Sequence, residues 1–100
     1  MKKLTNNQKK FLRARGHTLK PVVMVGQHGL SESVLAELES TMTKHELLKI
    51  KIRADDKDDR QKMIDEIVKV TRAQLIQVIG NVMVIYRAFK EEPEIILPRK

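Results

Sequence analysis

The stretch at residues 22–32 constrains the fold of this chain more than any other part of the sequence. It starts with four apolar residues, three of them valine, that stop at Gly26; two polar residues follow, then Gly29, and a helix signal begins at Ser31. An apolar, β-branched run that ends at glycine is typical of a buried strand, and glycine tolerates the backbone angles of a tight turn. The stretch therefore predicts a strand that turns into a helix through Gly-x-x-Gly.

The turn between Gly26 and Gly29, with Gln27 and His28 at its centre, is a candidate phosphate site. Backbone N–H groups at a helix N-terminus, together with the positive end of the helix dipole, attract anions. Glycine also lets a sugar-phosphate backbone approach where a Cβ would clash. However, any tight strand-to-helix turn favours glycine, so the motif alone does not separate a binding site from a structural turn.

Hydrophobic periodicity predicts three helices and four strands. The helices are expected at residues 5–15, 31–44 and 58–73, and the strands at residues 22–25, 48–53, 75–79 and 82–87. Because helices that alternate with strands require crossovers, the order α-β-α-β-α-β-β predicts a single α/β domain over residues 1–100 with a four-stranded mixed sheet. The tail at residues 88–100 is expected to form an edge strand or a flap.

Local signals mark the ends of several elements. Thr5 and Gln8 have the spacing of a capping box at the start of the first helix. Gly80 and Asn81 connect the last two strands, and glycine in the first position of a two-residue loop fits a type II′ turn. The strand that ends near Tyr86 is apolar on both sides, which predicts a central strand or one covered on both faces.

Side-chain patterns predict which residues face solvent. In the strand at residues 48–53, strict alternation sends Lys49, Lys51 and Arg53 to one face and apolar side chains to the other. Acidic residues on neighbouring strands would be able to neutralise these cations. The methionines, Met24 among them, are mostly at core spacing and are expected to fill gaps in the core.

Positive charge is concentrated at the start of the chain. The formal net charge is +7, and the first twenty residues contain seven Lys or Arg and no Asp or Glu, so the remaining eighty residues are electrically balanced. Such a concentration favours a polyanionic partner, because each phosphate that is neutralised releases counterions. The candidate contacts are Lys9, Lys10, Arg13, Arg15 and Lys20.

Composition argues against several classes of protein. Aromatic residues make up 3% of the chain, which disfavours binding by base stacking on aromatic side chains. Without cysteine there is no disulfide framework, which fits a cytoplasmic protein. No apolar run approaches the ~18 residues that a membrane span needs, and the first residues lack the apolar core of a signal peptide.

Catalytic and metal-binding motifs are not evident. The acidic stretch at residues 55–66 fails as a calcium loop, because Arg60 occupies the position that requires glycine. His17, His28 and His45 lie in separate segments without metal-ligand spacing, so no metal site is expected. There is also no nucleotide-binding glycine loop and no nucleophile elbow, so we expect neither a catalytic residue nor a cofactor.

Several blocks of the sequence together resemble one known family. The blocks are residues 19–23, 26–30, 45–51 and 77–80, with Tyr86 and Arg87 after them. In this order they resemble the CRM domain, named for chloroplast RNA splicing and ribosome maturation, and most of all its single-domain bacterial YhbY-type members. The resemblance covers nearly all of the chain. It implies a compact α/β fold similar to the C-terminal domain of translation initiation factor three.

The resemblance also implies a function. It implies RNA binding through a Gly-x-x-Gly loop comparable to that of KH domains, and association with precursors of the large ribosomal subunit. The residues that match this loop are Gly26, Gln27, His28 and Gly29. Some members of the family place a lysine inside the loop and this sequence does not, so the basic N-terminal helix is the expected source of positive charge beside it.

We therefore expect a cytoplasmic, monomeric RNA-binding module that associates with ribosomal RNA or pre-ribosomal particles, not with membranes. Beyond the loop, the expected RNA-binding residues are Lys9, Lys10, Arg13, Arg15, Lys20, Lys49 and Lys51. Two alternatives remain open: a ribosome-associated protein-interaction module whose basic arm only steers association, and a small phosphate-metabolite enzyme that uses His28 as an acid–base group.

Overall fold

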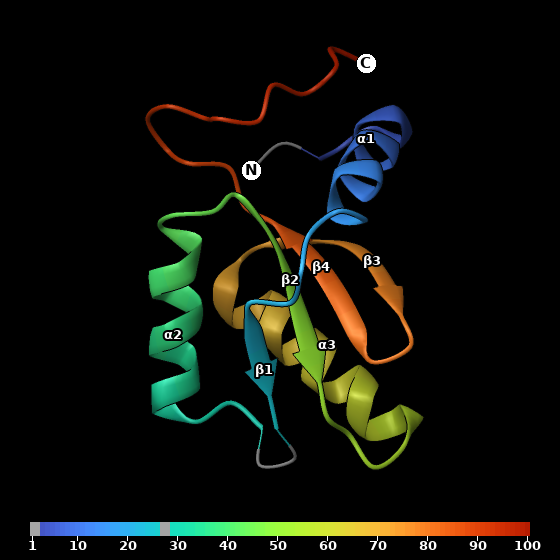
Figure 1. Cartoon of the computed structure of the whole chain (residues 1–100), viewed down its shortest axis with the longest axis vertical. Helices are drawn as coiled ribbons and strands as arrows, with labels where there is room; N and C mark the ends of the chain where they lie inside the picture. The colour runs from blue at the N-terminus through green and yellow to red at the C-terminus, as the bar shows by residue number, and fades with distance from the viewer. Residues whose placement is uncertain (1–2, 27–28) are drawn as a thin grey trace.

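The computed structural model describes residues 3–26 and 29–100, and within them the predicted order of elements is confirmed (Figure 1). The helices are α1 (Asn6–Gly16), α2 (Glu32–Met42) and α3 (Lys57–Thr71), and the strands are β1 (Val23–Val25), β2 (Leu47–Ile52), β3 (Gln74–Ile79) and β4 (Val82–Tyr86). Every end lies within two residues of its predicted position. The predicted capping box is also present at the start of α1, where Thr5 and Gln8 exchange backbone and side-chain hydrogen bonds.

The strands form one mixed sheet in the order β1-β2-β4-β3. β1 runs parallel to β2, and β4 runs antiparallel to both β2 and β3. β4 is therefore a central strand, and Met83 to Tyr86 are buried in it, as its apolar pattern predicts. In the turn before β4, Gly80 has a φ of +56°. Among the described non-glycine residues only Arg72 has a positive φ, so Asn81, the second residue of the turn, does not. A positive φ at the first turn position alone matches the predicted type II′ turn.

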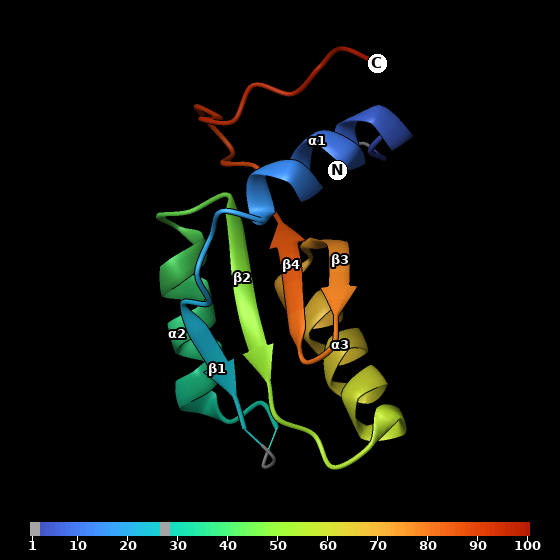
Figure 2. The same cartoon turned by 45° about the vertical axis from the view of Figure 1, so that its right-hand side comes forward.

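Helices α2 and α3 cover one face of the sheet (Figure 2). The side chains that β1, β2 and β4 send to this face include Val25, Ile50 and Ile85, which are fully buried. They pack against Leu38 of α2 and Ile67 of α3 in the larger of two clusters of buried residues. Burial of apolar surface is the main stabilising term in folding, so this face is committed to the core and is closed to ligands.

Helix α1 lies on the opposite face and covers only one end of it (Figure 2). It contacts β2, β4 and β3, and its Leu12 packs with Leu47 and Tyr86 in the second, smaller cluster. Gly16, the last residue of α1, allows a close approach to the sheet, because a Cβ there would lie 3.2 Å from the side chain of Val84. Within the described part of the chain, no helix covers the remainder of this face.

The tail at residues 88–100 is a flap, because none of it forms a strand. Glu46, at the entry to β2, is buried and anchors the flap. Its carboxylate accepts backbone N–H groups from Phe89 at 2.8 Å, Glu94 at 2.8 Å and Ile95 at 2.6 Å. Further on, the Gln8 side chain donates to the Pro98 carbonyl oxygen at 2.8 Å. Burial, reinforced by the charge of Glu46, raises the pKa of Tyr86 beneath this flap.

The end of α3 yields a stability prediction. Arg72, which ends α3, has φ 58° and ψ 21°, a left-handed conformation that favours glycine. We expect Arg72→Gly to raise the free energy of unfolding by about 0.5–1 kcal/mol, since the steric strain it relieves exceeds the extra backbone entropy of glycine in the unfolded chain. Urea unfolding measures the change. Arg72→Ala keeps the strain and should give no gain; equal stability of the two variants would contradict the prediction.

Candidate functional site

The two glycines of the predicted turn, Gly26 and Gly29, follow the end of β1 and are partly exposed. The Gly29 N–H donates to the Gly26 carbonyl oxygen at 3.0 Å, which closes the turn, and Gly29 has a φ of +78° that a glycine adopts without strain. Apart from each glycine and its chain neighbours, no described heavy atom lies within 4 Å of the position that a Cβ would take on Gly26 or Gly29. Described side chains therefore leave space beside both glycines.

Helix α2 starts just after this turn. Ser31 is its N-cap, as the sequence predicts, and the Ser31 hydroxyl accepts the Val34 N–H at 3.2 Å. The positive end of the α2 dipole thus points towards the turn, although Glu32 adds one negative charge in the first helical turn. The predicted contacts at Gln27 and His28 lie outside the described residues.

The predicted proximity of the basic N-terminal helix to the glycine turn is wrong. α1 lies at one end of the longest axis, which measures 39 Å, and the carboxyl end of β1 lies towards the other end (Figures 1 and 2). The reason is that residues 17–25 run the length of the sheet between them, and an extended chain advances about 3.3 Å per residue. Lys9, Lys10, Arg13 and Arg15 on α1 therefore do not touch the turn.

The lysines of β2 lie between these two ends. Lys49 and Lys51 point to the face that α1 covers in part, opposite the core side chains Ile50 and Ile52. The neighbours of these lysines across the sheet are apolar: Val84 beside Lys49, and Met24 and Val82 beside Lys51. No acid on a neighbouring strand neutralises them. Just beyond β2, the Arg53 N–H donates to the Val25 carbonyl oxygen at 2.8 Å, which places Arg53 at the base of the glycine turn.

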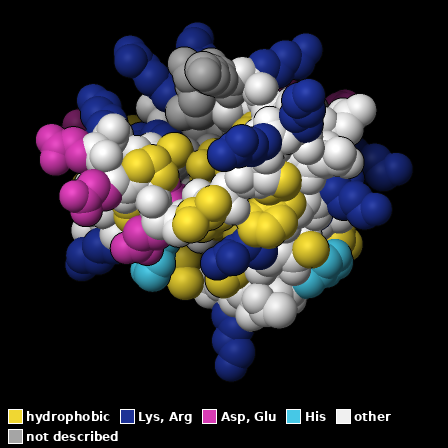
Figure 3. Space-filling model, turned by 90° about the horizontal axis from the view of Figure 1, so that it is seen from above, with side chains coloured by type: hydrophobic (Ala, Val, Ile, Leu, Met, Phe, Trp, Pro, Cys, Tyr) yellow, Lys and Arg dark blue, Asp and Glu magenta, His cyan; other side chains and the backbone are white. Residues whose placement is uncertain are grey.

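Neither α1 nor β2 contains an acidic residue. Seen from the α1 end, acidic side chains gather on the side where α2 and the bend of the tail lie, whereas Lys and Arg spread over the rest of this view (Figure 3). Among the described residues, Arg87 and Glu39 form an ion pair at 3.1 Å, which involves neither α1 nor β2. The cations of α1 and β2 are thus available to an anionic partner.

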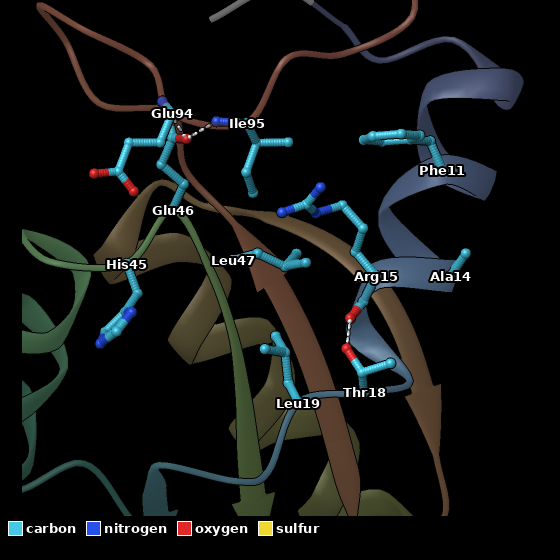
Figure 4. A pocket seen from close by; sticks show the side chains of 10 residues that line it. All are labelled: Phe11, Ala14, Arg15, Thr18, Leu19, His45, Glu46, Leu47, Glu94 and Ile95. Atoms are coloured by element: carbon cyan, nitrogen blue, oxygen red, sulfur yellow. Dashed lines mark hydrogen bonds between the residues drawn. The ribbon is translucent and has the colours of Figure 1, made fainter.

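A cavity of about 540 Å³ opens between α1, the start of β2 and the tail (Figure 4). The Arg15 guanidinium reaches into it, 5.7 Å from the centre of the Phe11 ring, which is a cation–π distance. Glu46 and Glu94 line the same cavity. Two carboxylates disfavour a phosphate here, so the cavity is a weaker candidate than the surface around Lys49 and Lys51.

Sequence reasoning missed exposed apolar residues on the open part of the sheet. Met24, expected in the core, is 53% exposed, and Ile79 is 58% exposed. Both lie on the same face as Lys51, because Met24 pairs with Lys51, Lys51 with Val82, and Val82 with Ile79. The alternation of Met24 with the buried Val23 and Val25 was the available signal, but it does not reveal that this face lacks a cover.

Known proteins similar to this chain agree on one family. The CRS1/YhbY (CRM) domain model matches residues 4–87. An "RNA-binding protein" of Haemophilus influenzae is 46% identical over 100 residues, which are 100% of both chains. A "probable RNA-binding protein" of Pseudomonas aeruginosa is 45% identical over 84 residues, covering 84% of this chain and 81% of that protein.

A solved structure of another protein has the same fold as this chain. The solution structure of a Staphylococcus aureus protein matches with a TM-score of 0.81 and 35% identity, covering 96% of this chain and 100% of that one. In the part of this chain that the structure describes, no helix has the length and apolarity to span a bilayer. The matched family model, the full-length relative and the shared fold lead to the same conclusion: the chain belongs to the CRS1/YhbY (CRM) domain family.

Proposed function

We propose that this chain is an RNA-binding module that holds the sugar-phosphate backbone and is not an enzyme. The observation that carries the proposal is the set of unpaired cations on one face, Lys49 and Lys51, between an open glycine turn and a basic helix. Unpaired cations in apolar surroundings favour phosphate, because binding neutralises them and releases counterions. The names of the relatives from Haemophilus influenzae and Pseudomonas aeruginosa support the same ligand class.

The backbone of the RNA would follow the long axis of the molecule. At one end, backbone N–H groups at the turn and at the start of α2 would donate to a phosphate, aided by the dipole of α2. Lys49 and Lys51 would hold the middle of the path. The cations of α1, with Lys20, would hold the far end. Phosphate contacts of this kind fix the position of the RNA and carry little sequence information.

Ribosomal RNA is the RNA we propose, in the form of large-subunit precursors whose assembly this protein would assist in the cytoplasm. Structured ribosomal RNA offers closely spaced phosphates and unpaired loops on one surface, which suits a ligand path of 39 Å or less. This part of the proposal rests on the resemblance of the sequence to YhbY-type proteins.

A single substitution in the turn tests the proposal. Gly26 has open space around its Cβ position and no positive φ, so both Asp and Asn fit there without strain. We expect Gly26→Asp to weaken binding of a large-subunit ribosomal RNA fragment about tenfold at ~0.15 M salt, since a carboxylate repels the phosphate. Filter binding or fluorescence anisotropy measures the affinity.

Gly26→Asn is the matched control, because it adds the same volume without charge. It should bind within about threefold of the parent. If Gly26→Asp unfolds at the parent's temperature and binds RNA as tightly as Gly26→Asn, the turn does not contact phosphate. In that case its glycines serve only the tight connection between β1 and α2.

A further inference from the structure

The part of the sheet that α1 leaves uncovered forms a defined surface, which we call the open sheet face. Strand register places two rows of side chains on it. The row nearer the glycine turn is Met24, Lys51, Val82 and Ile79. The next row is Val22, Lys49, Val84 and Gln77, of which Val84 is buried under the end of α1. The third row, which includes Leu47 and Tyr86, lies under α1 and the tail.

The open sheet face combines exposed apolar side chains with cations. Val22, Met24 and Ile79 are 51%, 53% and 58% exposed. A groove of about 270 Å³ crosses this face between the end of α1 and β3, and Lys49, Ile79 and Val82 are among its lining residues. Val22 and Met24 lie beside or on the outer strand β1 and Ile79 on the outer strand β3, with Lys51 and Val82 between Met24 and Ile79 in one row. Exposed apolar residues that share one surface are typical of a binding site.

The chemistry of this surface fits unpaired nucleotides better than a duplex. A duplex stacks its bases inside and presents phosphates and sugars, so it gains nothing from an apolar floor. An unpaired nucleotide offers both an apolar base face and a phosphate. Met24 and Ile79 match the base, Lys49 and Lys51 match the phosphates, and the face lies directly between the turn and α1.

We propose that the open sheet face binds the bases of a single-stranded RNA segment, with Met24, Val82 and Ile79 as the base-contacting floor. This inference rests on the proposed function and adds to it a preference for unpaired RNA. Since the floor is aliphatic, each base gains less than it would by stacking on an aromatic ring, so the preference comes from several bases together.

The test compares a single-stranded RNA of about ten nucleotides, the duplex of the same strand, and the strand with abasic nucleotides at its centre. The double variant Met24→Gln with Ile79→Thr removes apolar surface without changing charge. We expect it to weaken single-strand binding five- to tenfold, with duplex binding and the salt dependence unchanged. The parent should bind the abasic strand as weakly as the variant binds the intact one.

The matched control is Val70→Thr with Val78→Thr, which alters two exposed apolar residues, 44% and 38% exposed, on the α3 side of the sheet. It should bind all three RNAs as the parent does. The inference is wrong if the test variant binds single-stranded RNA as tightly as the control does. It is also wrong if the test variant loses affinity for the single strand and for the duplex equally. Gly26→Asp separates the two proposals: if it weakens binding while the sheet variant does not, only the base contacts fail.

Discussion

A variant with Lys9, Lys10, Arg13 and Arg15 all changed to glutamine should bind RNA about a hundredfold more weakly at ~0.1 M salt. A plot of log K against log salt has a negative slope, and each lost phosphate contact makes it less steep by roughly 0.7–0.9. The four substitutions should therefore make the slope less steep by about 3. Glutamine has nearly the helix propensity of lysine and arginine, and Thr5 and Gln8 still cap the helix. A salt titration of RNA binding measures both quantities.

The control removes the same number of charges from elsewhere on the surface. Lys44, Lys57, Lys62 and Lys69 are all exposed and lie at the end of α2 or on α3. Their replacement by glutamine should change affinity less than tenfold, because it alters only long-range attraction. Equal losses in the two variants would contradict a specific role for α1 and would favour a basic arm that only steers association.

Glu46→Gln should lower the free energy of unfolding by about 2–3 kcal/mol, the range expected when hydrogen bonds to a buried charged group are lost. The substitution hardly changes the volume, but it replaces an oxygen that accepts N–H groups with an amide that donates. Three backbone N–H groups of the tail, from Phe89, Glu94 and Ile95, converge on this carboxylate. Urea unfolding measures the loss, and hydrogen exchange of these amides should accelerate.

Glu94→Gln is the control for this prediction, since Glu94 is exposed and contributes only its backbone N–H to the anchor. Its stability should stay within about 0.5 kcal/mol of the parent. If Glu46→Gln leaves the exchange of the Phe89 and Ile95 amides unchanged, the tail is held by its apolar contacts instead.

Local patterns predicted the elements of this fold because their causes are local. The capping box at Thr5, the alternation of β2 and the glycine at position 80 each depend on residues within a few positions of one another. The order of helices and strands then limits the sheet to a few topologies. The role of Glu46 was not accessible in this way, because its partners lie 43 to 49 residues away in the sequence.

The position of the candidate site depends on how far α1 extends over the sheet, which hydrophobic periodicity does not reveal. α1 has 11 residues and spans about 16 Å, so it covers only part of its sheet face. For that reason Met24 and Ile79 are exposed while Val84, on the same face, is buried under α1. The sequence indicated which residues carry charge, and the packing of one short helix decided how far apart they lie.

The contact between Gln8 and the Pro98 carbonyl brings the beginning and the end of the described chain together, at the end of the molecule far from the glycine turn (Figure 1). A tether, an affinity tag or a fused domain at either terminus would therefore point away from the turn. If several copies were joined in tandem, the glycine turn of each copy would stay unobstructed. The architecture is thus suited to modular extension.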